Sequence, residues 1–175
     1  MNWKKISEKV IFKGWRNIIQ KKFNLPNGKE ASFDILSNKD YVTIAAFTAD
    51  QKVILVKQYR PGPETVLTSF PEGALEKGEA VEIAAARELL EETGYQASTI
   101  THLKTFKSAY TNQQQICVLA TGCKKIATQQ LDDTEFIEVF LLPVEKLRHF
   151  LTDSSNESFT NVDAAYLALD TMDLL

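Results

Sequence analysis

One segment bounded by glycines constrains this chain of 175 residues more than any other part. Gly73 and Gly78 break the backbone before the segment, and Gly94 follows it. The run from Glu79 to Thr93 contains neither proline nor glycine and is rich in alanine, leucine and glutamate, which are good helix formers. The sequence therefore predicts a single helix along this run, closed by the glycine that follows.

Three acidic side chains cluster within this expected helix. Glu88, Glu91 and Glu92 stand at positions i, i+3 and i+4, so their carboxylates project from about 100° of the helix surface. They lie in the C-terminal half, where the helix dipole disfavours further negative charge. For an isolated pattern of this kind, a solvated helix face is the common explanation. The alternative is a bound hard cation such as Mg²⁺ or Mn²⁺, which takes oxygen ligands and bridges to phosphates.

An apolar stripe is expected on roughly the opposite side of the same helix. Ile83, Ala86 and Leu90 recur at i, i+3 and i+7, a spacing typical of a face that packs on a core. On this interpretation the three carboxylates face away from the core.

The spacing of residues across the segment resembles the Nudix box. That motif, G-x5-E-x7-R-E-U-x-E-E-x-G-U with U aliphatic or aromatic, is matched at every fixed position of residues 73–95, with Tyr95 in the last U position. A chance match at so many spaced positions is remote, so the chain resembles a Nudix hydrolase. The resemblance implies a mixed β-sheet between helices, with the box forming a loop, a helix and a loop on one side.

The resemblance also implies roles for the acidic residues of the box. Glu88 and Glu92 are the leading metal ligands, and Glu91 is a further ligand or a base that orients water. The backbone carbonyl of Glu72 completes the set of ligands. A metal held in this way screens the charge of a pyrophosphate, orients its phosphates and lowers the pKa of a bound water.

Arg87 is expected beside these acids. Its guanidinium carries a fixed charge and five donors, which can hold Glu79 or Glu91 in place. The simpler interpretation is an i,i+4 ion pair with Glu91, and both can hold at once. We count Glu79 among the residues expected near the substrate.

Segments outside the box are similar to the ADP-ribose pyrophosphatase branch of the Nudix proteins. These segments are LPNGK (Leu25–Lys29), VILVKQYR (Val53–Arg60), FPEGALEKGE (Phe70–Glu79) and DTEFIEVFLLPVEKL (Asp133–Leu147). The similarity implies a β-rich N-terminal segment, a Gln-x-Arg strand end at the substrate site, and homodimers whose N-terminal strands reach the partner subunit.

The chain also departs from the pattern of that branch. Ser69–Gly73 (SFPEG) stands where the branch usually has E-x-P-A-G, and Tyr110 replaces the proline of a Ser-Pro-Gly turn. The loop Asn112–Gln115 lacks the glutamate that often acts there as a general base. The base is then a box glutamate or an acid from a later loop. The candidates in that loop are Asp132, Asp133 and Glu135.

Two further residues are expected to bind substrate. Tyr110 offers an aromatic face on which a nucleobase can stack, although a tyrosine packed on the sheet edge is equally compatible with the pattern. Arg60 lies at a strand end before a proline-rich loop and can clamp a phosphate, or it forms a plain surface ion pair.

Composition excludes several other classes of protein. Apolar residues make up 44% and charged residues 25%, and the net charge is −3, which argues against a nucleic-acid-binding surface. No apolar run approaches the ~20 residues needed to span a bilayer, and the N-terminus lacks the apolar segment of a secretory signal. Cys117 and Cys123 are too few for a disulfide framework. We therefore expect a cytoplasmic protein that binds neither membrane nor nucleic acid.

The rest of the chain predicts more strands than helices. Strands are expected at residues 10–12, 15–23, 30–36, 41–48, 52–59, 65–70, 100–107, 115–122 and 136–142. A short helix is expected from Pro143 to Leu151, and a last helix from a capping box at Thr160 and Asp163. The fold class is α/β (α+β), a Nudix-type α/β/α sandwich with a mixed sheet, preceded by an antiparallel β meander.

These observations predict a division of the chain and a function. Residues 1–40 form a β-rich segment for dimerisation or for covering the substrate, and residues 41–175 form the hydrolase domain. With Mg²⁺ or Mn²⁺, the protein hydrolyses the pyrophosphate bond of a nucleoside diphosphate derivative such as ADP-ribose or a nucleotide sugar. The alternatives are hydrolysis of a dinucleoside polyphosphate or a noncanonical nucleoside triphosphate, and a Nudix module that binds nucleotides without cleaving them.

Overall fold

The computed structural model describes residues 2–153 and 158–175, which fall into two units. We call them the N-terminal unit (residues 1–40 and 106–115) and the large unit (residues 41–105 and 116–175). The predicted boundary at residue 40 therefore does not assign segment 106–115 to the N-terminal unit, to which it belongs.

The N-terminal unit is built on a three-stranded antiparallel sheet. Its strands β1 (Lys4–Lys13), β2 (Asn17–Asn24) and β3 (Glu30–Ser37) follow one another in order. The turn between β2 and β3 contains Gly28, whose φ of 79° is a left-handed conformation that glycine adopts without strain. Segment 106–115 joins β3, because Leu36 donates its N–H to the carbonyl of Tyr110 at 2.9 Å. The predicted antiparallel meander is thus present, and its first strand is longer than expected.

The large unit contains one eight-stranded sheet. The main strand order is β11-β5-β4-β10-β8, while β6 pairs with β5, β7 with β4 and β9 with β10. The strands are β4 (Tyr41–Thr48), β5 (Lys52–Arg60), β6 (Thr65–Ser69), β7 (Glu72–Ala74), β8 (Tyr95–Gln96), β9 (Thr99–Lys107), β10 (Gln114–Lys125) and β11 (Ile137–Pro143). The ends of β9 and β10 extend into the N-terminal unit.

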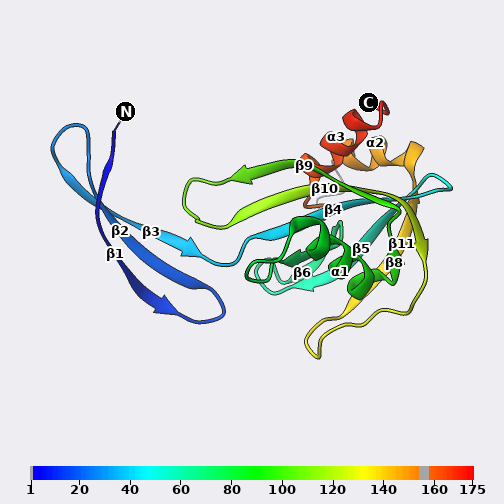
Figure 1. Ribbon diagram of the computed structural model, residues 1–175, viewed down its shortest axis with the longest axis horizontal. Coiled ribbons are helices and arrows are strands. Elements are labelled where there is room, and N and C mark those ends of the chain that lie inside the picture. Colours follow the sequence, from blue (N-terminus) through cyan, green and yellow to red (C-terminus); the bar gives the residue numbers. More distant parts are fainter. Residues whose placement is uncertain (1, 154–157) are drawn as a thin grey trace. The chain divides into compact units, whose positions relative to one another are not determined.

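Three helices accompany this sheet, namely α1 (Val81–Thr93), α2 (Val144–Thr152) and α3 (Val162–Thr171). Strand β4 contacts both α1 and α3, and it lies between them in Figure 1. Successive residues of a strand point to opposite faces, and Val42, Ile44 and Ala46 of β4 share one core cluster with Leu89 of α1. This mixed α/β architecture is the predicted fold class. In the part of the chain that the structure describes, no helix combines the length and apolarity needed to cross a bilayer.

The orientation predicted for α1 is wrong. Ile83 is 62% exposed and Ala86 is also exposed, whereas the buried apolar residues are Ala84, Ala85 and Leu89. Alanines occur all around this helix, so the larger Ile83 and Leu90 suggested a stripe that tertiary packing does not use. The carboxylates of Glu88 and Glu92 therefore lie beside the buried face rather than opposite to it.

The two helix starts also differ from expectation. Helix α1 begins at Val81 after the N-cap Ala80, and Glu79 lies outside it. The predicted capping box at Thr160 does not form, because Asn161 occupies the N-cap of α3. The amide of Asn161 does not cap the helix. Instead it accepts a hydrogen bond from the Phe70 N–H at 2.9 Å and donates one to the Glu72 carboxylate on β7.

Candidate active site

Strand β7 provides the backbone against which the acidic helix packs. It pairs with β4 so that Gly73 lies opposite Val42. A Cβ atom added to Gly73 would lie only 1.7 Å from the carboxyl carbon of Glu88, so any side chain here would displace that carboxyl group. The first glycine of the motif is therefore required for the close approach of Glu88 to the backbone.

Glu92 lies deeper than Glu88. It is 6% exposed, and its Oε2 accepts a hydrogen bond from the Glu72 N–H at 3.1 Å. Burial raises the pKa of the Glu92 carboxyl well above its usual value, and the hydrogen bond from Glu72 opposes this shift only partly. Glu92 is thus a carboxyl group held at β7 in a place that disfavours its charge.

Arg87 gathers three carboxylates around one guanidinium. Its Nε and Nη2 donate to the two carboxylate oxygens of Glu79 at 2.9 and 3.0 Å, which is a bidentate pair. Its Nη1 donates to Glu88 at 2.7 Å and to Glu91 at 3.1 Å. These hydrogen bonds, first those with Glu79, raise the pKa of Arg87 further above its usual range. Both expected arrangements, the i,i+4 pair and the clamp on Glu79, are therefore present.

The side chain of Glu72 forms a second polar network beside β7. Its Oε1 accepts hydrogen bonds from the Thr43 hydroxyl at 2.8 Å and from the Asn161 amide at 2.7 Å. Arg60 lies 3.8 Å from Oε2, so its ionic partner is this largely buried acid. Burial raises the pKa of Glu72, whereas Thr43, Asn161 and Arg60 lower it. The expected role of Glu72 involved its backbone carbonyl alone. In the structure its side chain also links β7 to Thr43 of β4 and to Asn161 at the start of α3 through hydrogen bonds.

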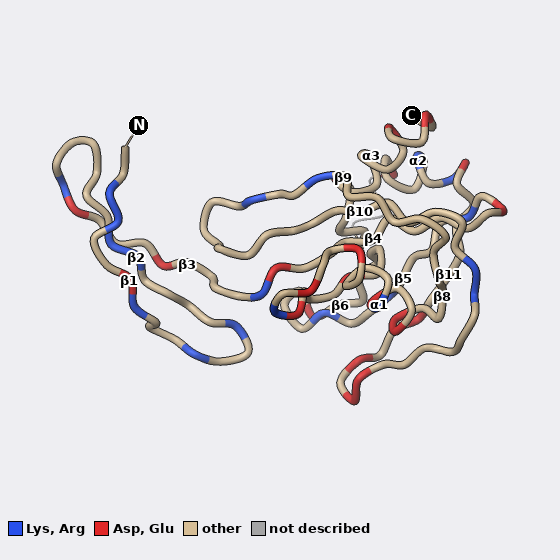
Figure 2. The backbone as a smooth tube through the Cα atoms, in the orientation of Figure 1, with Lys and Arg blue, Asp and Glu red and all other residues tan. Residues whose placement is uncertain are grey.

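A polar cavity of about 290 Å³ opens between β7, α1 and the loop that joins β10 to β11. Its lining residues are Glu72, Gly73, Ala74, Glu76, Arg87, Glu88, Glu91, Gln130, Asp132 and Glu135. We call it the acidic cavity. Acidic residues gather on α1 and on that loop in Figure 2. Glu92 is not among the lining residues, so the expected set of three carboxylates is split between the cavity and the buried backbone beside it.

The loop between β10 and β11 contributes residues that the box motif does not include. The Gln130 N–H donates to the carbonyl of Glu91 at 2.8 Å, and the Gln129 amide donates to the carbonyl of Glu92 at 2.7 Å. Asp132 and Glu135 line the acidic cavity, whereas Asp133 does not. Of the three candidate bases on this loop, the structure thus brings two to the acidic cavity.

The oxygen donors of the site are of the type that a hard divalent cation takes. Burial raises the pKa of Glu88, the Arg87 charge lowers it, and the nearby Glu91 and Glu135 carboxylates raise it. Within residues 2–153 and 158–175, no group of three or more His, Cys, Asp or Glu side chains converges closely enough to hold a metal ion. The Arg87 guanidinium stands among the carboxylates of Glu79, Glu88 and Glu91. The predicted metal ligands are therefore neighbours, but they do not converge on one point.

Tyr110 belongs to the N-terminal unit and is not among the residues that line the acidic cavity. Together with Trp3, Phe23 and Phe33 it lines a pocket of about 350 Å³. The Trp3 ring packs against Phe23 and Phe33 with centroids 5.9 and 5.4 Å apart. The Tyr110 side chain is 64% exposed, so its role as a stacking platform stays a prediction.

Several residues of the site could not be found from the sequence. Thr43 and Asn161 hold Glu72 from 29 positions before it and 89 after it. Neither has a motif, and only the fold brings them together. Glu135, in contrast, is one of the candidate bases expected on this loop from the sequence.

Comparisons with known proteins agree with this geometry. The model of the NUDIX domain matches residues 38–162. An ADP-ribose pyrophosphatase of Bacillus subtilis (strain 168) is 34% identical over 146 residues, which cover 81% of this chain and 79% of the relative. A protein of Bacillus methanolicus named methanol dehydrogenase activator is 32% identical over 149 residues, covering 83% and 80%. The crystal structure of an ADP compounds hydrolase has a TM-score of 0.84 at 24% identity, covers 100% of this chain and 98% of its own, and shares the fold.

Proposed function

Because this chain belongs to the Nudix family of hydrolases, we propose that it cleaves the pyrophosphate bond of a nucleoside diphosphate derivative. ADP-ribose and nucleotide sugars are the proposed substrates, which accords with the name of the relative from Bacillus subtilis. The products are a nucleoside monophosphate and the phosphorylated second moiety.

One observation carries this proposal. The carboxyl group of Glu88 packs on the bare backbone of Gly73, and Glu92 accepts the neighbouring N–H of Glu72. Two acids are thereby held at β7 although burial disfavours their charges. Such an arrangement is expected where a cation or a reacting group needs them, because perturbed carboxyl groups cluster at functional sites.

The proposed cofactor is Mg²⁺ or Mn²⁺. Glu88, Glu91, Glu92 and the carbonyl of Glu72 would hold it, and these are oxygen ligands of the kind that such ions prefer. When bound, the ion neutralises phosphate charge and makes water more acidic. For Glu91 to take part, its hydrogen bond with Arg87 has to loosen or be shared.

The remaining roles belong to side chains of the chain itself. Arg87 holds Glu79, Glu88 and Glu91 in position, and it thereby orients the carboxylates rather than touching the substrate. Arg60, half-exposed and anchored by Glu72, is placed to donate to a substrate phosphate. The proton of the attacking water passes to one of the carboxylates of the acidic cavity, namely Glu91, Asp132 or Glu135.

The test is release of nucleoside monophosphate from ADP-ribose, nucleotide sugars and dinucleoside polyphosphates in Mg²⁺ or Mn²⁺. Glu92→Gln keeps an acceptor for the Glu72 N–H but removes the charge, so we expect turnover to fall about 1,000-fold. Glu82→Gln, on the exposed first turn of the same helix, is the matched control and should turn over like the wild type. Equal turnover in Glu92→Gln and Glu82→Gln would contradict the proposed site.

A second candidate function is binding without hydrolysis. The relative from Bacillus methanolicus is named for activation of another enzyme, and the loop Asn112–Gln115 of this chain has no acid. Calorimetric binding of ADP-ribose without product over hours would favour this function. Cleavage of dinucleoside polyphosphates or noncanonical nucleoside triphosphates in preference to ADP-ribose would favour the third alternative.

We further propose that residues 1–40 mediate a homodimer or cover the substrate. All ten residues of β1 are exposed, and the large apolar ones among them are Ile6, Val10, Ile11 and Phe12. A double substitution Val10→Lys and Phe12→Lys should yield monomers in sedimentation at concentrations where the wild type is dimeric. Ile126→Lys, an equally exposed position in the large unit, is the control.

A cytoplasmic location, without binding to nucleic acid or membrane, is part of the same proposal. Burial raises the pKa of Cys117 to about 12 and that of Cys123 to about 11, so both remain unreactive thiols. Reduced, buried thiols are what a reducing compartment maintains.

A further inference from the structure

The side chain of Glu72 is a largely buried carboxylate to which the box motif assigns no role. It stands where the related branch usually has the alanine of E-x-P-A-G, and only its backbone carbonyl was expected among the metal ligands. The side chain is 18% exposed, and its Oε1 accepts hydrogen bonds from both Thr43 and Asn161. Burying an acid lowers stability unless its partners compensate, so this carboxylate calls for a function besides packing.

Asn161 is a fixed donor to this carboxylate. It is 5% exposed, and its Nδ2 lies 2.7 Å from Glu72 Oε1. The chain just before it pairs with β6, where Thr68 donates its N–H to the Ser158 carbonyl at 2.8 Å and accepts the Thr160 N–H at 3.1 Å. The start of α3 is thereby attached to the sheet, and it holds one oxygen of the Glu72 carboxylate in place.

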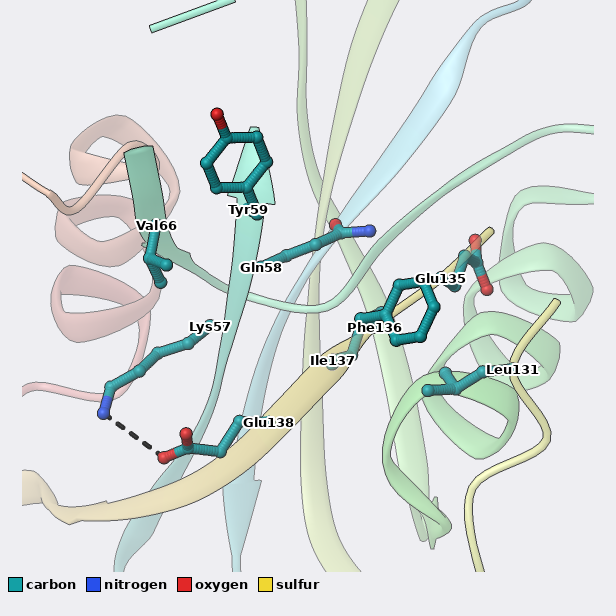
Figure 3. Close-up of a pocket in the computed structure, with 9 residues that line it drawn as sticks. All are labelled: Lys57, Gln58, Tyr59, Val66, Leu131, Glu135, Phe136, Ile137 and Glu138. Carbon is teal, nitrogen blue, oxygen red and sulfur yellow. Dashed lines mark hydrogen bonds and ion pairs between the residues drawn. The ribbon is translucent and has the colours of Figure 1, made fainter. Parts of the chain in front are cut away.

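The other oxygen of Glu72 faces Arg60 at the end of β5. Nη2 of Arg60 lies 3.8 Å from Oε2, which is longer than a hydrogen bond, so charge attracts the guanidinium while Glu72 does not consume its Nη2 donors. Lys57 on the same strand is paired with Glu138 at 3.3 Å, as the dashed line in Figure 3 shows. Of these two cations, Arg60 is therefore the one that an acid of the acidic cavity holds with donors to spare.

Glu72 also reaches the proposed metal site through its backbone. Its N–H donates to Glu92 at 3.1 Å, while its side chain faces Arg60. One residue thus contacts the buried acid at one end of the site and the arginine at the other. Because Thr43 and Asn161 fix the carboxylate, the charge that attracts Arg60 is fixed relative to these acids.

We propose that Asn161 and Glu72 form a positioning pair for Arg60. Asn161 fixes the Glu72 carboxylate, and the charge of this carboxylate holds the Arg60 guanidinium beside the acidic cavity, where it donates to a substrate phosphate. The role of Arg60 in this arrangement rests on the proposed function. An arginine that is already held loses less side-chain entropy when a phosphate binds, so the pair acts mainly on substrate affinity.

The first test removes the charge of Glu72 and keeps its shape. Glu72→Gln retains an oxygen that accepts from Thr43 and Asn161. Steady-state kinetics on ADP-ribose with Mg²⁺ compare it with Arg60→Ala and with the double variant of both. Loss of a phosphate contact should raise the KM of Arg60→Ala about 10-fold, and loss of positioning should raise that of Glu72→Gln about 5-fold. The double variant should match Arg60→Ala, because Glu72 acts through Arg60.

The second test separates positioning from packing. Asn161→Asp keeps the acceptor for the Phe70 N–H but replaces the donor to Glu72 with a second carboxylate, so it should lower the melting temperature and raise KM. Combining it with Glu72→Gln exchanges the amide and the carboxylate between the two positions. The exchange restores a hydrogen-bonded pair but moves the charge away from Arg60. We therefore expect the melting temperature to recover and KM to stay as high as in Glu72→Gln.

Glu64→Gln is the matched control, because Glu64 is an exposed acid on the turn that follows Arg60. It should leave KM, kcat and the melting temperature unchanged. Two results would overturn the positioning pair. One is a Glu72→Gln effect that persists in full in the Arg60→Ala background, and the other is recovery of KM together with the melting temperature in the exchanged variant.

Calorimetry of ADP-ribose in a chelator gives the same comparison as affinities, without turnover. Losses of affinity that Glu72→Gln and Arg60→Ala share, in a protein that hydrolyses no pyrophosphate, would support the positioning pair and refute the proposed hydrolysis. Hydrolysis in which the two substitutions act independently would support the proposed hydrolysis and refute the pair.

Discussion

The two sheets of this protein differ in how they bury apolar side chains. In the large unit, β4 is buried from Val42 to Phe47 and β5 from Val53 to Val56, and Val42, Ile44, Val53 and Ile54 are fully inaccessible. In β1–β3 of the N-terminal unit only Ile19 and Ile35 fall below one-tenth exposure. A sheet covered on both faces supplies its own stability, whereas a largely exposed one depends on whatever surface covers it.

The comparison extends to the ionisable groups. In the N-terminal unit Glu8 is exposed, and its hydrogen bond with Lys5 lowers its pKa. In the large unit, burial raises the pKa of Glu72, Glu88 and Glu92. Keeping these buried carboxyl groups charged therefore lowers the free energy of unfolding of the large unit. This is also the unit in which we locate the chemistry.

The largest expected effect contrasts the two cores directly. Leu89→Ala removes a fully buried side chain of α1 and should lower the free energy of unfolding by about 2–5 kcal/mol. Val10→Ala on β1, where the side chain is 62% exposed, should change it by less than about 0.5 kcal/mol. Urea unfolding followed by circular dichroism measures both. A similar loss in the two variants would mean that β1 is covered in solution.

The next effect concerns a glycine that packing requires and one that it does not. Gly73→Ala pushes the Glu88 carboxyl away from β7, and a displacement of about 1 Å at a reacting group costs about 100-fold in kcat. Gly62→Ala is the control, because a Cβ there meets no atom within 4 Å. Steady-state kinetics on ADP-ribose measure both variants. Full activity in Gly73→Ala would show that the position of Glu88 is not critical.

A smaller effect follows from the raised pKa of Glu92. Its folded-state pKa lies above the ordinary value of 4.5, so between these two values the native state binds more protons than the unfolded state. Without divalent cations, stability should therefore be greatest below pH 4.5 for this group and fall as pH rises through the window. One proton accounts for at most about 1.4 kcal/mol per pH unit.

Unfolding of the wild type and Glu92→Gln in a chelator, across this pH range, measures the contribution. The Glu92→Gln variant should lose the part of the slope that the wild type owes to Glu92, and added Mg²⁺ should flatten the wild-type curve. Identical slopes in the two proteins would show that Glu92 is not buried as a carboxyl group in solution.

How much of this could be predicted from the sequence depends on the range of the interactions. The apolar runs of β4 and β5 and the closure of α1 by Gly94 are local features, and the structure has them as predicted. The three residues of β7 carry no strand signal, because they form a strand only by pairing with β4. The predicted buried face of α1 is wrong for a related reason. Ala84 and Ala85 pack in one core cluster with residues of β4, and the periodicity of the helix alone cannot show this long-range contact.

The same distinction between local and long-range interactions applies to the residues of the site. Motif spacing located Arg87 and the box glutamates, and the structure brings Glu88 close to Gly73. Spacing could not separate the buried Glu92 from the half-buried Glu91, because both project from one side of an ideal helix. It also could not find Asn161, which reaches the Glu72 side chain only because the chain returns to the sheet 89 positions later.

The smallest effects arise within the N-terminal sheet, and its two tryptophans allow them to be measured separately. The chain has only Trp3 and Trp15, so tryptophan fluorescence reports on this unit, whereas circular dichroism reports on the whole chain. Trp3 packs on Phe23 and Phe33, and Trp3→Ala should cost about 1–2 kcal/mol in the fluorescence transition followed through Trp15. Trp15 is 91% exposed, and Trp15→Ala should shift the transition by less than about 0.5 kcal/mol.

The Trp15→Ala variant, in which Trp3 alone fluoresces, also compares the stability of the two units. If the two units owe their stability to different surfaces, its fluorescence transition occurs at a lower urea concentration than its circular dichroism transition. Coincident transitions would show that the sparsely buried sheet is stabilised as strongly as the large one.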